Sequence, residues 1–134
     1  YPGWLYPVTK GATTIWEHWD GIKEDGSFWS ADMNSFNHYA YGAVADWVFE
    51  QAAGIAHPED APGFAALQYA PKADRRLGWL RAKLHTRRGD IISAWSYEGD
   101  SIRFELETPV PTQVNLPNTT KTVTPGRYIF WEKA

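Results

Sequence analysis

The sequence predicts an α+β protein, in which an N-terminal helical segment is followed by an antiparallel β-sandwich. Between residues 34 and 54, apolar residues recur at spacings of three and four, as on one face of a helix. The stretch HPEDAPG at residues 57–63 is rich in proline and acid, which is typical of a linker. From residue 64 onward, short runs of alternating apolar and polar residues are separated by turn signals, as in the strands of a sandwich.

The first ten residues, YPGWLYPVTK, do not favour a continuous helix. Pro7 has no amide hydrogen to donate and its ring crowds the preceding turn of a helix. We expect this segment to be either the frayed end of a helix or a loop that packs through Trp4 and Leu5.

Residues 13–19 admit two interpretations. The three β-branched residues TTI at its start favour an extended segment. Thr14 followed three residues later by Glu17 equally fits a capping box, in which the two side chains satisfy amides at the start of a short helix.

A polar segment follows, at residues 23–32, after the turn signal Asp20-Gly21. We expect it to be an exposed loop. Phe28 and Trp29 within it are candidates to fold over a site.

The strongest helix signal begins at Asn34 or Ser35, either of which suits an N-cap, and ends at Gly54. The apolar residues of this helix are predicted to form one wide, buried face: Phe36, Tyr39, Ala40, Ala43, Val44, Trp47, Val48 and Ala52. The chain has no second long helix to cover that face. The N-terminal part is therefore expected to belong to a larger helical body.

Six segments beyond the linker are predicted to be strands: 64–69, 79–86, 90–97, 101–107, 112–116 and 127–131. Turn signals such as Glu98-Gly99-Asp100 and Pro125-Gly126 separate them. Asn118-Thr119-Thr120 matches an N-glycosylation acceptor, although a turn between two strands is the expected role.

Length and composition exclude several classes of function. The chain has 134 residues and a net charge of −3, so it has no basic surface for nucleic acid. No run approaches the roughly 20 apolar residues of a membrane span. Cysteine is absent and the four histidines lack ligand spacing, so we expect neither a metal nor a cofactor. Of the eight tryptophans, half or more are expected to be large side chains of the core, and some are expected to be flat surfaces on which sugar rings pack.

Glu17 is the candidate catalytic residue, because Trp16 and Trp19 flank it and are expected to exclude water from its carboxylate. His38 falls one turn into the predicted helix, and is either a partly buried histidine with satisfied hydrogen bonds or a donor to a sugar hydroxyl. Trp19 and Asn37 are further candidates for substrate contact. Glycoside hydrolysis usually uses two carboxyl groups. No nearby acid has a setting like that of Glu17, so its partner is expected outside this chain.

Two stretches, GATTIWEHWDG at 11–21 and MNSFNHYAYGAVADWVFEQAAGI at 33–55, resemble the C-terminal end of bacterial α-L-rhamnosidases of glycoside hydrolase family 78. The APGF segment at 61–64 continues the resemblance into a strand. The likeness is close to about residue 71 and looser through the GDIISAW and TQVNLP segments.

The resemblance implies that residues 1–55 are the end of an (α/α)₆ barrel and that residues 56–134 are a C-terminal β-sandwich. The implied activity is the inverting release of terminal α-L-rhamnose from rhamnose-containing glycosides. Glu17, in TTIWE, would be the general base, and His38, in NSFNH, a sugar ligand. The general acid would come from the upstream barrel of the same polypeptide. His18 stands where the family often has arginine.

A second hypothesis belongs to a different class of protein. The tryptophan-rich strands also suit a non-catalytic carbohydrate-binding or structural module, with the sandwich as its working part. We prefer a packing role for the sandwich within an enzyme. The compartment, bacterial cytoplasm or exterior, does not follow from the sequence.

Overall fold

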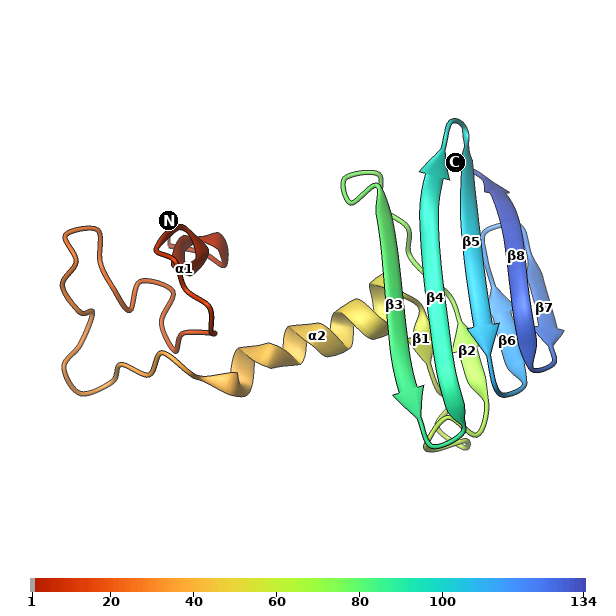
Figure 1. Cartoon of the computed structure of the whole chain (residues 1–134), viewed down its shortest axis with the longest axis horizontal. Coiled ribbons are helices and arrows are strands. Elements are labelled where there is room, and N and C mark those ends of the chain that lie inside the picture. Colours follow the sequence, from red (N-terminus) through yellow and green to blue (C-terminus); the bar gives the residue numbers. More distant parts are fainter. Residues whose placement is uncertain (1) are drawn as a thin grey trace. The chain divides into compact units, whose positions relative to one another are not determined.

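The computed structural model describes residues 2–134. They form two compact units, one that ends at Ala45 and one that begins at Asp46 (Figure 1). No helix among the described residues combines the length and the apolar character that are needed to cross a bilayer.

The first unit consists mainly of loops around one short helix. The helix α1 spans Leu5–Thr9 and contains a buried Pro7, which its first turn tolerates because amides there lack helical partners. Leu5 is 76% exposed, so the prediction that this segment packs through Leu5 is wrong. In the loop that follows, an isolated bridge joins Ile22 and Phe28.

The long helix begins later than the sequence predicts. Three helical segments follow one another without a break: η1 (Tyr39–Ala43), α2 (Val44–Trp47) and η2 (Val48–Ala52). His38 is extended and occupies the N-cap position, so the predicted start at Asn34 or Ser35 is wrong. At the other end Gly54 has a φ of +68°, the left-handed conformation expected of a residue that ends a helix.

The apolar face predicted for this helix is mostly open. Ala52 is the buried member of the set, whereas Tyr39 is 91% exposed and Trp47 is also exposed. The pattern therefore identifies an apolar face correctly, but the described residues do not cover it.

The second unit is a β-sandwich of two four-stranded sheets. The first sheet has the order β1-β2-β6-β7, with strands Ile55–Ala56, Leu67–Tyr69, Thr112–Asn115 and Thr120–Val123. The second has the order β3-β4-β5-β8, with strands Trp79–Thr86, Gly89–Glu98, Ser101–Thr108 and Gly126–Lys133 (Figure 1). All neighbouring strands are antiparallel except β2 and β6.

The sandwich core lies between the inner faces of the two sheets. Large side chains from both sheets are fully buried there, among them Tyr69, Trp95 and Phe104. The end of the helical segment is bonded to this core: Trp95 Nε1 donates to Ala52 O at 2.8 Å, and Ser93 Oγ donates to Ala53 O at 2.6 Å. These bonds satisfy carbonyls that the helix end leaves without partners.

A turn joins β6 to β7, as predicted for Asn118-Thr119-Thr120. Leu116 N donates to Thr119 O at 2.8 Å. The backbone and side-chain nitrogens of Asn118 both donate to Glu132 Oε2, at 2.9 and 2.7 Å. Glu132 is buried on β8, so these bonds connect the turn of one sheet to a strand of the other.

Candidate functional site

Two segments far apart in the sequence pair in the first unit and bring the predicted site residues together. Glu17 N donates to Ser35 O, and His38 N donates to Ile15 O, both at 2.8 Å. The hydroxyl of Thr14 donates to Phe36 O. Because these bonds use the backbone of residues 35–38, the helix starts only after His38.

The carboxylate of Glu17 is held by the same pairing. Its Oε2 accepts a hydrogen bond from Ser35 N at 3.0 Å. Residues 13–19 are not helical, and Thr14 and Glu17 both bond to the 35–38 segment, so the capping-box interpretation is wrong. The other carboxylate oxygen, Oε1, makes no hydrogen bond within residues 2–134. Glu17 is half-buried, with one oxygen anchored and one free.

The two tryptophans beside Glu17 have different environments. Trp16 is 5% exposed and packs edge-on against Phe36, with ring centroids 5.1 Å apart. Trp19 is exposed, and its ring lies 6.0 Å from that of Trp4. Trp16 is therefore a core anchor, and Trp19 presents an aromatic surface that a sugar ring can contact.

An apolar hollow of about 280 Å³ lies beside this segment. Its lining comes from residues 4–19 and includes Trp4, Ile15 and Trp19, but not Glu17. Sequence spacing contains no signal that would pair Trp4 with Trp19, because the two residues come from separate loops.

His38 and Asn37 follow directly after the segment that holds Glu17. The His38 ring is half-buried and lies 6.3 Å from the ring of Tyr41. Neither of its ring nitrogens is hydrogen-bonded in the described part of the chain. Asn37 is exposed, and its backbone nitrogen donates to Ser35 Oγ at 3.3 Å. Both side chains are therefore free to bond a ligand.

The polar loop folds back on the residue next to Glu17. Trp29 stacks on His18, with ring centroids 3.8 Å apart and an interplanar angle of 21°. Phe28 is exposed, with its ring 5.8 Å from that of Phe36. The prediction of an exposed loop is confirmed, and the partner of Trp29 is His18, the position at which the family often has arginine.

No three histidine, cysteine or acidic residues group around a possible ion anywhere among the residues that the structure describes.

Within the polar loop, Asp25 accepts hydrogen bonds from the side chain and the backbone of Ser27. These bonds hold the turn at Gly26 together, and they keep the pKa of Asp25 below its usual value.

Two family models match the chain. Residues 1–52 match the bacterial α-L-rhamnosidase six-hairpin glycosidase domain, and residues 54–127 match the bacterial α-L-rhamnosidase C-terminal domain. An α-L-rhamnosidase of Streptomyces avermitilis is 40% identical over 123 residues, and one of Formosa agariphila is 38% identical over 120 residues. These alignments cover 92% and 90% of this chain.

Solved structures of α-L-rhamnosidases also match this chain. The α-L-rhamnosidase of Streptomyces avermitilis, complexed with L-rhamnose, matches 99% of the chain with a TM-score of 0.86 and 28% identity, and 15% of its own chain is covered. The α-L-rhamnosidase of Aspergillus terreus matches 97% with a TM-score of 0.87 and 29% identity, over 16% of its own chain. The chain spans only 11% and 12% of the length of the two curated relatives.

Proposed function

The chain belongs to the bacterial α-L-rhamnosidase family, and from this premise we propose that its full-length protein is an inverting glycosidase that releases terminal α-L-rhamnose from rhamnose-containing glycosides. Residues 1–55 then form the end of the catalytic barrel, and residues 56–134 its C-terminal sandwich. The chain carries the general base, Glu17. The general acid lies in the upstream barrel of the same polypeptide.

The observation that carries this proposal is the anchoring of one Glu17 oxygen. A general base needs a fixed orientation and a free oxygen within reach of the proton that it removes. The bond from Ser35 N to Oε2, at 3.0 Å, supplies the orientation and leaves Oε1 for a water molecule. A side chain whose carboxylate is already held by a hydrogen bond loses less freedom when the reaction begins.

The proposed mechanism assigns each remaining residue one task. An inverting enzyme keeps its two carboxyl groups about 6.5–9.5 Å apart, so that a water fits between the base and the sugar. Glu17 takes a proton from that water as the water oxygen attacks the anomeric carbon, while the upstream acid protonates the leaving oxygen. His38 and Asn37 bond sugar hydroxyls, and Trp19 contacts the apolar face of the ring.

The test is the Glu17→Gln variant of the full-length protein. Glutamine keeps an oxygen to accept from Ser35 N, but it cannot take a proton from water. We expect kcat on an aryl α-L-rhamnoside to fall about 10²–10⁴-fold with little change in KM. Glu24→Gln, in the exposed loop, is the matched control and should keep its activity. Near-normal turnover by Glu17→Gln contradicts the assignment.

The stereochemistry is tested on the unmodified full-length protein, by proton NMR during the first turnovers of an aryl α-L-rhamnoside. Attack of water on the face opposite the leaving group releases β-L-rhamnose first, before mutarotation mixes the anomers. Release of α-L-rhamnose first would indicate a covalent intermediate and a retaining mechanism.

A further inference from the structure

Two exposed tryptophans lie at opposite edges of one face of the sheet β3-β4-β5-β8. Trp79 on β3 is 70% exposed, and Trp131 on β8 is 55% exposed. The strand register places both in one row across the sheet, in the order Trp79, Ser96, Arg103, Trp131. Neighbouring strands lie about 4.8 Å apart, so roughly 14 Å separates the Cα atoms of the two tryptophans.

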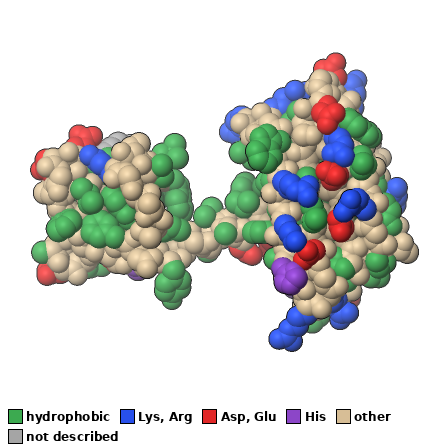
Figure 2. All heavy atoms as spheres, in the orientation of Figure 1, with side chains coloured by type: hydrophobic (Ala, Val, Ile, Leu, Met, Phe, Trp, Pro, Cys, Tyr) green, Lys and Arg blue, Asp and Glu red, His purple; other side chains and the backbone are tan. Residues whose placement is uncertain are grey.

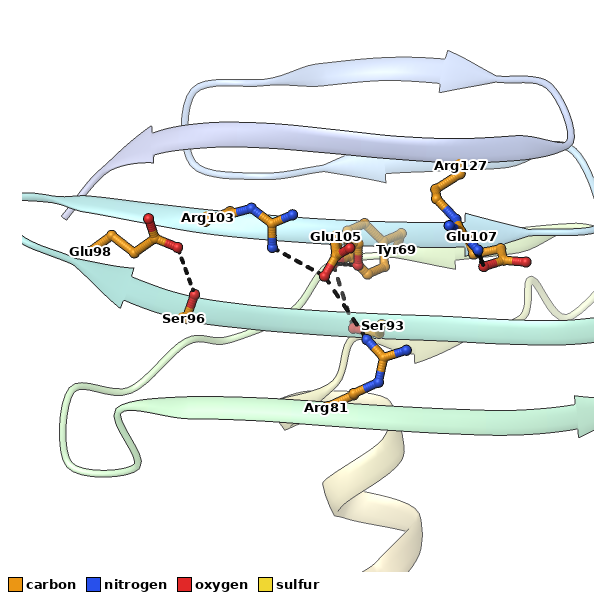
Figure 3. Close-up of polar contacts among 9 residues, drawn as sticks. All are labelled: Tyr69, Arg81, Ser93, Ser96, Glu98, Arg103, Glu105, Glu107 and Arg127. Atoms are coloured by element: carbon orange, nitrogen blue, oxygen red, sulfur yellow. Dashed lines mark hydrogen bonds and ion pairs between the residues drawn. The ribbon is translucent and has the colours of Figure 1, made fainter.

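The face between the tryptophans is polar. Figure 2 shows Lys and Arg side chains interspersed with Asp and Glu over this sheet. Arg103 Nη1 lies 3.1 Å from Glu105 Oε2, and Arg81 Nη1 lies 3.9 Å from the same oxygen, so two strands direct guanidinium groups at one carboxylate (Figure 3). A guanidinium has five N–H donors, and most of those of Arg81 and Arg103 are left for a ligand.

The polar centre also presents acceptors. Ser96 Oγ donates to Glu98 Oε1 at 3.3 Å, and both side chains lie on the outer face (Figure 3). The hydrogen bond from Arg103 holds the pKa of Glu105 below its usual value, so this carboxylate remains an acceptor at neutral pH. Both donors and acceptors are therefore present on the face between the two aromatic edges.

This arrangement is the reverse of a protein-binding surface. Protein interfaces have an apolar centre and a polar rim. Here the apolar groups, Trp79 and Trp131, form the edges, and charged groups form the centre. A protein that covered this face would have to remove water from the Arg81–Glu105–Arg103 group, at a cost that ion pairing does not always offset.

A chain of sugar rings has the complementary pattern. A pyranose ring has an apolar C–H face that packs on an indole, and hydroxyl groups at its rim that bond guanidinium and carboxylate groups. A face that is four strands wide is long enough for an extended chain of several rings. We propose that the outer face of β3-β4-β5-β8 binds a polysaccharide that lies across the strands from Trp79 to Trp131.

The test measures binding of the full chain to rhamnan, a neutral polymer of rhamnose, by affinity electrophoresis and isothermal titration. The choice of a rhamnose polymer rests on the proposed function. We expect saturable binding that each of Trp79→Ala and Trp131→Ala weakens about tenfold and that the double variant weakens further. Trp79→Tyr should retain most of the affinity because it keeps a flat ring.

Three controls distinguish binding at this face from a general effect of removing an exposed ring, from unfolding and from binding of a single sugar. Tyr39→Ala removes an exposed ring elsewhere in the chain and should leave binding unchanged. Circular dichroism should show the same thermal midpoint for all variants, since both tryptophans are exposed. L-Rhamnose alone should bind much more weakly than the polymer, because it spans only one ring position.

Either of two results overturns the proposal: no saturable binding to rhamnan, or undiminished binding by the double tryptophan variant. The binding proposal and the catalytic proposal are tested by different measurements, so they can fail separately. In the full-length protein, Glu17→Gln should bind the polymer normally, and the tryptophan variants should hydrolyse a small aryl rhamnoside at the normal rate.

Discussion

Replacing Gly54 by alanine is expected to destabilise the sandwich by about 2–5 kcal/mol. Gly54 has a φ of +68°, a conformation that costs a residue with a Cβ atom about 1–2 kcal/mol. A Cβ built there would lie 2.1 Å from Pro71 N and 2.4 Å from Ala70 C. Both are backbone atoms, so the clash is relieved only when one chain segment moves away from the other.

The segment opposite Gly54, residues 70–72, cannot move away without weakening two backbone hydrogen bonds. Ala70 N donates to Gly54 O at 3.1 Å, and Lys72 N donates to Gln51 O at 2.9 Å. Separating the two segments by the ångström or more that the methyl group needs weakens both bonds, each worth about 0.5–1.5 kcal/mol. Adding these losses to the conformational cost gives an expected total of about 2–5 kcal/mol.

Gly99→Ala is the matched control. Gly99, in the turn between β4 and β5, has a φ of +63° and no atom within 4 Å of the position that a Cβ would take. Alanine there is expected to carry the conformational cost alone, about 1–2 kcal/mol. The difference between the two variants therefore isolates the clash at Pro71.

Amide hydrogen exchange of the innermost β4 and β5 residues measures the effect, because it reports the free energy of opening the sandwich itself. The free energy of opening should fall substantially more for Gly54→Ala than for Gly99→Ala. Equal losses in the two variants would refute the close approach of residues 54 and 71.

Two further predictions concern a side chain in the turn between β6 and β7 and an ion pair in the loop between β2 and β3. Asn118→Ala removes one of the two hydrogen bonds to the buried Glu132 and should cost about 1–3 kcal/mol in the same exchange experiment, with a loss below about 0.5 kcal/mol contradicting the role given to Asn118. Hydrogen bonds from the Arg76 side chain and backbone lower the pKa of Asp74 to about 2. The contribution of this exposed pair to stability is thus present above the ordinary pKa of 3.8 and is lost as the pH falls through about 2. A carbon-13 NMR titration should show the Asp74 midpoint near 2, and Arg76→Gln should raise it toward 3.8, so an unchanged midpoint would contradict the pairing.

Strands were predictable wherever a local pattern marked them. Alternation and turn signals place β3, β4 and β5 within one residue of their observed bounds. The sequence prediction missed β1 and β7. β1 has two residues, and β7, TKTV, is mostly exposed, so neither shows an alternating pattern. Both are recognisable only from the strands with which they pair.

The start of the long helix was not predictable from local preference. Asn34 and Ser35 are favourable N-cap residues. In the structure, however, Ser35 bonds to Glu17 through both its backbone nitrogen and its backbone oxygen. These long-range bonds satisfy the backbone of residues that would otherwise begin a helix, and so they move the start to Tyr39.

For the candidate site, the sequence by itself determined the chemistry: an acid between tryptophans, and an amide and an imidazole about twenty residues later. Tertiary structure alone decided that Ser35 anchors Glu17, that Trp16 is buried while Trp19 is exposed, and that Trp79 and Trp131 share one row of a sheet. Periodicity, caps and turn residues act over a few neighbouring residues, so they can be recognised in the sequence. Pairing between residues 17 and 35, or across four strands, depends on the path of the chain through space, and no local pattern encodes it.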